Sequence, residues 1–445
     1  MSGEISRRGA LCGAAALALA GTSSARGRSQ VGGRAQLRVP WPVASIDPHK
    51  LDDAAAAIFG NALFDGLYTY TDTSSVAPAL AEAEPELVGD EVRVKLRAGI
   101  VTALGHALTA RDVTLSIARA RSLGAAAWLA DVPSPKRIDD STISFATRDP
   151  QKLAHTLASP LLVIVPSGFS DASPDGTGPM RADHRGGALV LSRNPRSARA
   201  PSFLDEVSVA LAPDLSSSLR AFEAGGDDLG WLGLGLHEPR AGAKSFDGGP
   251  CAWAILRTGA LASAWDSPGN AQRLCDGIAP TKLAYLGLGA AWTTDKDEGW
   301  GGAPCELLVR DDSPWLVELA RAVAATLSRA GHEVVPKPIS AADFSSKRGS
   351  RAYALAVDVV RAFSPGAIGA LAGLSTSSDP TSAADAIRHP PRLGDVSVRT
   401  LPRTLRVGIL GEVRAQGGRV AELSLPTSAD GTGVDWGQAT RGPRR

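Results

Sequence analysis

The residue types that most often carry catalysis form no catalytic pattern in this chain. No G-x-S-x-G elbow is present to expose a nucleophilic serine, and no serine lies three residues before a lysine. A phosphate-cradling P-loop is excluded because no Gly-Lys dipeptide occurs. His332-Glu333 is followed by Val-Val-Pro instead of a second histidine, so there is no zincin helix, and the seven histidines are scattered. We therefore predict a protein that is not an enzyme and that needs no metal or cofactor.

Tryptophan and arginine are the residues here best suited to holding a ligand. A tryptophan covers a large area and offers one N–H donor, and Trp41, Trp231 and Trp253 lie at or near strand ends. Arg257 and Arg361 are candidate partners for a ligand carboxylate, because a guanidinium fork matches a carboxylate bidentately. The alternative for each tryptophan is core packing, and for each arginine a solvated surface position.

Length and composition limit the class of protein. At about 150 residues per domain, 445 residues predict two or three structural units. The apolar fraction of 44% is that of a globular chain. The formal charge of +1 leaves no overall basic field for nucleic acid or an anionic membrane. No apolar run reaches the roughly 20 residues of a membrane span, so we expect a soluble mature chain.

The first thirty residues resemble an export signal. Ser6-Arg7-Arg8 precedes an apolar stretch over 9–21, and the small residues Ser23-Ser24-Ala25 offer a cleavage site. The paired arginines favour the twin-arginine route, and a disordered basic N-terminus is the alternative. Leu11, directly before Cys12, argues against lipoprotein anchoring. We therefore expect a periplasmic protein.

Three cysteines remain once this signal is removed: Cys251, Cys275 and Cys305. Either one disulfide with one free thiol, or three thiols, would be compatible with an oxidising compartment. No C-x-x-C pair occurs, which excludes a thioredoxin-like site or a zinc ribbon.

The hydrophobic periodicity predicts mixed α and β structure throughout. Residues 306–310 should form a strand, Ser313-Pro314 a helix start, and 333–335 a returning strand, which together make a parallel β-α-β unit. The apolar run Leu161–Val165 suggests a further short strand. The segment Ser375–Pro391, rich in Ser, Pro, Asp and Ala, is interpreted as a loop or linker.

Several blocks, in order, resemble the family 5 extracellular solute-binding proteins, the peptide- and nickel-binding receptors of ABC importers. The blocks are Ser45-Ile-Asp-Pro-His49, the segment 61–68, Val76–Glu82, Val94–Ile100, the segment 108–116, Gly176-Thr-Gly-Pro179 and Arg193-Asn-Pro195. The similarity extends from about residue 37 to about residue 365.

The resemblance implies a two-lobed α/β periplasmic-binding-protein fold, class II and cluster C-like, with a hinge between the lobes and the ligand at their interface. The expected organisation is a signal peptide (1–30), lobe I (31–245, with a subdomain at about 66–169), lobe II (250–395), a return segment completing lobe I (396–426) and a disordered tail (427–445). It also implies a monomeric receptor that delivers a peptide-like or other organic solute to a membrane permease. Ser45, in the first block, joins the candidate ligand contacts.

The chain departs from the family pattern at two of the candidate arginines. Arg257 stands where members commonly have Asn, and Val360–Pro365 lacks the acid that anchors a peptide amine in peptide-binding members. A standard free-amine peptide would meet Arg361 there. These departures keep two alternatives open: a sensor, chaperone or degenerate binder of the same fold, and a secreted enzyme with an unrecognised site.

Overall fold

A computed structural model describes residues 31–72, 74–231, 240–289, 299–388, 401–429, 431 and 433–443. The predicted signal peptide lies outside these residues. The described helices are α2 (Ala54–Leu63), α3 (Ala110–Ala120), α4 (Pro150–Leu157), α5 (Leu215–Glu223), α6 (Asn270–Asp276), α7 (Pro314–Leu327), α8 (Ala341–Ser350), α9 (Gly366–Ser378) and α10 (Pro380–Arg388). None of these described helices combines the length and the apolar character that crossing a membrane requires.

One curled sheet of ten strands organises most of the chain, in the order β14-β13-β15-β12-β16-β11-β1-β10-β9-β8. Its strands are β1 (Arg34–Val39), β8 (Met180–Arg185), β9 (Ala188–Arg193), β10 (Glu206–Leu211), β11 (Leu229–Trp231), β12 (Lys244–Thr258), β13 (Cys305–Arg310), β14 (Val334–Ile339), β15 (Leu355–Arg361) and β16 (Val407–Arg419). Short separate pairs are β2 (Tyr68–Tyr70) with β3 (Val76–Pro78) and β17 (Leu423–Ser424) with β18 (Thr440–Arg441).

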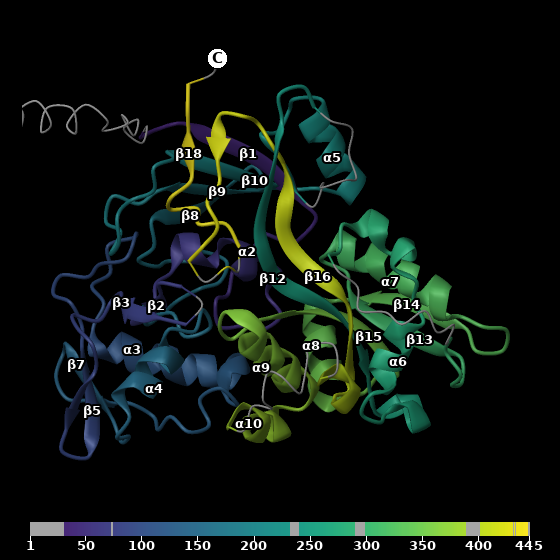
Figure 1. Ribbon diagram of the computed structural model, residues 1–445, viewed down its shortest axis with the longest axis horizontal. Helices are drawn as coiled ribbons and strands as arrows, with labels where there is room; N and C mark the ends of the chain where they lie inside the picture. The colour runs from purple at the N-terminus through teal and green to yellow at the C-terminus, as the bar shows by residue number, and fades with distance from the viewer. Residues whose placement is uncertain are drawn as a thin grey trace, which may run out of the picture.

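The two longest strands, β12 and β16, cross from one lobe to the other. They run side by side and antiparallel (Figure 1), and their pairing shifts register three times between Asp247 and Ile255. Gly249 lies in this irregular stretch with φ of 90°, and an added Cβ would lie 2.3 Å from the Gly431 carbonyl oxygen. A side chain is therefore excluded where the strand bends. The strands β1 and β8–β11 lie on one side of this crossing, and β13–β15 lie on the other.

The predicted β-α-β unit is confirmed. β13 and β14 pair in parallel and α7 joins them, starting with Ser313 as N-cap and Pro314 in the first turn. The Ser313 side chain accepts from the Leu316 backbone N–H, which satisfies one free donor of the first turn. Helix α7 ends at Leu327, before Gly331, and buries Leu319 and Val323 against the sheet.

A four-stranded subdomain sheet follows β3 in the chain. Its order is β4-β5-β7-β6, formed by Glu86–Val88, Glu91–Lys95, Thr142–Phe145 and Lys136–Arg137. Val92 and Val94 are buried while Arg93 and Lys95 are exposed, as the alternation predicts. Helices α3 and α4 belong to the same region, which lies below lobe I in Figure 1.

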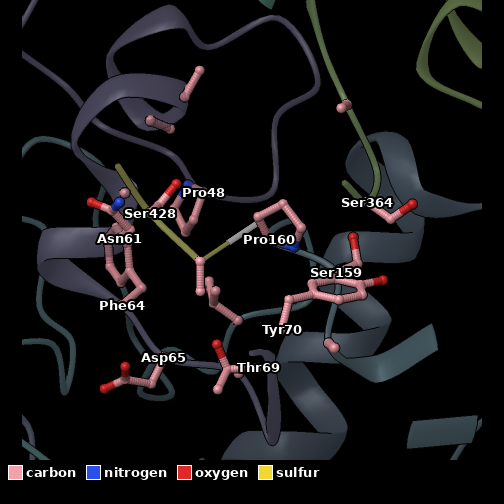
Figure 2. Close-up of a pocket in the computed structure, with 18 of the residues that line it drawn as sticks. Pro48, Asn61, Phe64, Asp65, Thr69, Tyr70, Ser159, Pro160, Ser364 and Ser428 are labelled. Atoms are coloured by element: carbon pink, nitrogen blue, oxygen red, sulfur yellow. The ribbon is translucent and has the colours of Figure 1, made fainter. Parts of the chain in front are cut away.

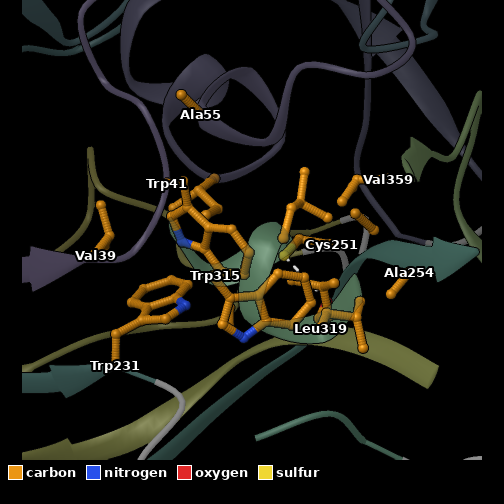
Figure 3. Packing of buried hydrophobic residues seen from close by; sticks show 14 of the residues in the cluster. Val39, Trp41, Ala55, Trp231, Cys251, Ala254, Trp315, Leu319 and Val359 are labelled. Atoms are coloured by element: carbon orange, nitrogen blue, oxygen red, sulfur yellow. Dashed lines mark hydrogen bonds between the residues drawn. The ribbon is translucent and has the colours of Figure 1, made fainter. Parts of the chain in front are cut away.

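The largest apolar core spans both lobes. Trp41, just after β1, packs on Trp315 of α7 with ring centroids 4.7 Å apart, and both are almost fully buried. Figure 3 shows this contact with Trp231, Cys251 and nearby aliphatic side chains around it. The two lobes are therefore joined by a tryptophan contact as well as by the crossing strands.

Three predicted segments differ from the structure. Much of the linker predicted at Ser375–Pro391 is helical, because Pro380 occupies the first position of α10, where a missing N–H costs nothing. The tail beyond residue 427 is folded where it is described, since Trp436 is fully buried and β18 pairs with β17. The run Leu161–Val165 is buried but forms no strand in the described structure.

Candidate functional site

The segment Pro48–Asp52 lies between the lobes and is held from lobe I and the subdomain. Asp47, 1% exposed, receives two hydrogen bonds from Arg119 of α3, at 2.7 and 2.6 Å. His49 bridges Arg119 and the Val163 carbonyl oxygen, with both contacts at 2.9 Å. Because the guanidinium can only donate and the carbonyl can only accept, His49 is neutral with its proton on Nε2. Asp47 and His49, from the first block of the family resemblance, therefore hold this segment in place.

Burial lowers the pKa of His49 to about 4, and burial raises the pKa of Asp53, which caps α2, to about 6. Asp53 accepts from the backbone N–H groups of Ala56 and Asp47, both at 2.8 Å. The segment and the start of α2 are therefore tied together by buried polar groups.

Lobe II holds the same segment from the other side. The Arg361 backbone N–H donates to the Leu51 carbonyl oxygen at 3.0 Å, and Arg361 Nη1 donates to the Pro48 carbonyl oxygen at 2.9 Å. Asp52 is bridged by Arg348 of α8 at 2.5 Å and by Arg310 of β13 at 3.9 Å. Two cavities lie next to this contact between the segment Pro48–Asp52 and lobe II. No residue lines both of them.

The first cavity, which we call the α2 cavity, has a volume of about 260 Å³. Figure 2 shows it enclosed by one face of α2, by β2, by the loop around Ser159 and by Ser364 beyond β15. The C-terminal segment adds Ser428. The cavity is thus bounded by both lobes, the subdomain and the C-terminal segment, which is where closure of two lobes would enclose a solute.

The charges that line the α2 cavity balance. Asp65, buried, pairs with Arg199 at 2.5 Å, and Arg361 and Asp435 both belong to the same lining. Asn61 donates to the Val434 carbonyl oxygen at 2.8 Å, but its Oδ1 is buried without a hydrogen-bond partner in the described structure. Burial raises the pKa of the Cys251 thiol to about 12, so it is not a nucleophile at neutral pH. The cavity therefore offers an unused hydrogen-bond acceptor.

The second cavity, which we call the arginine cavity, has a volume of about 340 Å³. It lies between the ends of β12 and β15, the C-terminal ends of α8 and α9, and the subdomain. Its lining includes Asp52, Arg257, Thr258, Arg348, Arg351, Tyr353, Thr376, Ser377, Asp379 and Arg406. Leu123 in this lining is exposed and Arg351 is partly exposed, so the cavity reaches the surface.

The structure brings two of the six predicted contact residues to these cavities. Arg361 lines the α2 cavity and Arg257 lines the arginine cavity, although Arg257 also pairs with the buried Asp358 at 3.0 Å. Both arginines are nearly buried, so neither takes the solvated surface position of the alternative interpretation.

The other four lie elsewhere. Trp41 and Trp231 are fully buried in the core, Trp231 packing on Phe246 at 5.9 Å, and Trp253 is 5% exposed in the subdomain-side core. Ser45 is exposed, and neither cavity is lined by any of these four. A ligand contact by any of the six residues stays a prediction.

Sequence reasoning missed the unpaired groups. Asn61, Thr258 and Thr376 have no distinguishing motif, and only the folded chain shows that their polar atoms lack partners. The three cysteines among the described residues, Cys251, Cys275 and Cys305, are free thiols, which is one of the two possibilities that the sequence left open. Among the described residues, no group of three His, Cys, Asp or Glu could hold a metal ion.

Comparison with known proteins places this geometry in a class. Residues 75–239 match the family profile of the bacterial extracellular solute-binding proteins, family 5, middle part. The predicted resemblance to that family is therefore confirmed. A comparison with curated proteins found no match.

Solved structures extend the likeness over almost the whole chain. The binding protein AgaA from A. tumefaciens R10, in complex with agropinic acid, is 15% identical with a TM-score of 0.67, over 93% of this chain and 99% of its own. DppA from Helicobacter pylori, with the peptide STSA, is 16% identical with a TM-score of 0.68, over 93% and 98%. NikA from Brucella suis, with Fe(III)-EDTA, is 16% identical with a TM-score of 0.63, over 92% and 100%.

The solved structures show the class of fold, and the profile match shows which family the chain resembles. The fold is that of the two-lobed periplasmic binding proteins, as the sequence predicted. Within that class, residues 75–239 are similar to the middle part of the family 5 solute-binding proteins. This family and this fold are those of binding proteins rather than enzymes.

Proposed function

We propose that this protein is an extracytoplasmic receptor that binds a small organic solute in the α2 cavity and delivers it to an ABC permease in the membrane. The observation that carries the proposal is a cavity bounded by both lobes, with the unpaired Asn61 Oδ1 and the Arg361 guanidinium in its lining. Solutes that carry both a donor group and an anionic group match these two features.

The volume of the cavity limits the size of the solute that it can bind. Its volume of about 260 Å³ lies at the lower edge of the roughly 300–1,000 Å³ typical of small-molecule sites. The direct bond between Arg361 and Leu51 also closes the gap between the segment Pro48–Asp52 and β15. A small molecule therefore fits better than a long peptide.

Filling the cavity tests the proposal. Gly60 lies on the cavity face of α2, and an added Cβ would meet only the Arg361 guanidinium, at 3.9 Å. Gly60→Leu should fill the cavity without disturbing the helix, while Gly60→Ala is the matched control that leaves most of the space. A thermal-shift panel of amino acids, dipeptides, organic acids and metal chelates should then be run on all three proteins.

We expect at least one compound to raise the melting temperature of the wild type and of Gly60→Ala, but not of Gly60→Leu. No shift with any compound, or an equal shift in all three proteins, would overturn the placement of the solute site. Delivery to a permease is tested separately: adjacent permease and ATPase genes, and loss of solute uptake when the receptor gene is deleted, are expected.

A sensor of the same fold is the second candidate. The lobes contact one another directly, through Trp41 and Trp315 and through Asp52 and Arg348. Such contacts would suit a receptor whose closed form is recognised by a signalling partner. A solute-bound protein that supports no uptake in vivo would favour this candidate over import.

A further inference from the structure

The arginine cavity contains buried polar groups that nothing in the described chain satisfies. Thr258, at 1% exposure, and Thr376, at 5%, both line it, and each has a buried Oγ1 without a hydrogen-bond partner. A hydroxyl that is buried without a hydrogen-bond partner destabilises the folded state. Two such groups in one cavity of about 340 Å³ indicate that a polar molecule completes the site.

Two pairs of guanidinium groups give this cavity its charge. Arg257 and Arg348 share Asp358, with N···O distances of 3.0 and 3.2 Å, and Arg257 also donates to the carbonyl oxygen and the hydroxyl of Ser377. On the other side, Arg351 and Arg406 share Asp266, Arg406 at 3.4 Å. The four arginines line the cavity, whereas Asp358 and Asp266 do not.

The acidic groups of the lining are already engaged. Asp52 pairs with Arg348 and Arg310 across the lobes, and Asp379 accepts the backbone N–H of Thr381 at 2.9 Å. Tyr353, 5% exposed, lines the cavity together with Arg257, Arg348 and Arg351. A cation would therefore meet four guanidinium groups and no free carboxylate, while an anion would meet donors on several sides.

We infer that the arginine cavity is a binding site for a small organic dicarboxylate. One carboxylate is held at the Arg257–Arg348 pair and the other at the Arg351–Arg406 pair, since guanidinium groups bind carboxylates through paired N–H donors. Thr258, Thr376 and Tyr353 supply hydrogen bonds to the oxygens. The cavity is larger than an inorganic phosphate requires, and its two separate arginine pairs match two anionic groups.

This site is independent of the solute site proposed above, because the two cavities share no lining residue. Its arginines come from lobe II and its end of the crossing strands, while Asp52 and Gly124 in the lining come from lobe I and the subdomain. A bound dicarboxylate would therefore add contacts at the lobe junction.

Isothermal titration calorimetry with succinate, malate and glutarate on the full-length mature protein tests the inference. Succinamide, which has the same shape without charge, and inorganic phosphate are the comparison compounds. We expect at least one dicarboxylate to bind, with an affinity that falls as NaCl is added, and succinamide and phosphate to bind at least about tenfold more weakly.

Thr258→Val and Thr376→Val probe the same site while keeping side-chain shape. Each should weaken dicarboxylate binding by about tenfold, the effect of a lost hydrogen bond to a charged group. Neither should lower the melting temperature of the ligand-free protein, because each removes an unpaired buried hydroxyl. Gly60→Leu, which fills the other cavity, should leave dicarboxylate binding unchanged.

Three results would overturn the inference: no dicarboxylate binding at millimolar concentration, phosphate binding more tightly than every dicarboxylate, or unchanged dicarboxylate binding in both threonine variants. If Gly60→Leu alone abolished dicarboxylate binding, the anion would occupy the α2 cavity, which would contradict this site but support the proposed function.

Discussion

At the scale of single residues, buried polar groups fix the segment between the lobes. His49 accepts a hydrogen bond from Arg119 and donates one to Val163, and burial lowers its pKa to about 4. An imidazolium would have to point an N–H at a guanidinium that cannot accept. The anchor of the segment Pro48–Asp52 therefore depends on a neutral histidine.

This geometry predicts the titration of His49. In NMR spectra of the protein labelled at its histidine rings, the His49 signals should not shift between pH 8 and pH 5. A His49 midpoint near 6.5 would contradict the proposed tautomer.

The titration of Asp53 should offset the effect of His49 titration on the free energy of unfolding. The unfolded chain binds a proton at His49 below about pH 6.5 and the folded chain only near pH 4, so folding stability falls as pH drops through this window. The raised pKa of Asp53, about 6, acts oppositely between pH 6 and 3.8, where the folded state holds the extra proton. In Asp53→Asn that opposing contribution is absent.

Urea denaturation at a series of pH values measures the difference. Between pH 6.5 and 4, Asp53→Asn should lose about 3 kcal/mol of unfolding free energy from His49 titration, at roughly 1.4 kcal/mol per pH unit. The wild type should lose much less over the same range. Parallel curves for the two proteins would show that His49 and Asp53 are not coupled to folding in this way.

At the scale of elements, helix α2 is covered by the C-terminal segment. Trp436 is fully buried, its indole N–H donates to the Ile58 carbonyl oxygen at 3.0 Å, and its ring lies 5.6 Å from that of Phe59. Because α2 also forms one wall of the α2 cavity, the C-terminal segment supports the proposed solute site.

Trp436→Ala should lower the unfolding free energy by about 3–5 kcal/mol, the usual cost of deleting a large buried aromatic side chain. Exposed Leu104→Ala is a control that should change stability by less than about 0.5 kcal/mol. Equal stabilities of the two variants, measured by urea denaturation, would mean that the segment beyond residue 427 does not pack on α2.

Gly60→Ala, the control for cavity filling, also makes a prediction of its own. Glycine inside a helix costs about 1 kcal/mol relative to alanine, and the new methyl group meets no close neighbour. The variant should gain roughly that amount in the same denaturation assay. A loss of stability would show that the face of α2 toward the cavity has less room than the structure indicates.

Local signals predicted elements well where caps and periodicity agree. Ser313-Pro314 marks the start of α7 in the sequence, and the β-α-β unit follows from the strands on either side. The helix α10 was missed because Pro380 after Asp379 suggests a turn as readily as a helix start. The buried run Leu161–Val165 has no strand partner, and an apolar run alone cannot show that.

The candidate site was predictable only in part. Arginine chemistry pointed to Arg257 and Arg361, and both line cavities. The three tryptophans were chosen for their size, but size also favours core packing, and their surroundings depend on contacts between distant segments. The unpaired hydroxyls of Thr258 and Thr376 are a property of the folded chain alone.

At the scale of the whole molecule, Asp52 joins the lobes. Burial would raise its pKa, but the charges of Arg348 and Arg310 outweigh this and hold the pKa below its ordinary value. Removing the carboxylate takes away the lobe I partner of Arg348 and Arg310, which keep Asp358 and Asp312 within lobe II, so the ion pairs that hold the lobes together are lost.

Asp52→Asn should therefore shift the protein toward an open form, with a larger radius of gyration in small-angle X-ray scattering. Glu82→Gln, which removes an exposed ion pair with Lys95, is the matched control and should leave the scattering unchanged. An unchanged radius in Asp52→Asn would indicate that the tryptophan contact and the crossing strands hold the lobes without this bridge.

The most direct test of the account is native mass spectrometry of the gently purified wild type beside Gly60→Leu, followed by denaturation and identification of any released molecule. A receptor that encloses its solute between two lobes releases it slowly. We predict a discrete small-molecule adduct on the wild type, of a size that the α2 cavity can hold, and none on Gly60→Leu. The same adduct on both proteins, or none on the wild type after incubation with the compound panel, would contradict a solute site in the α2 cavity.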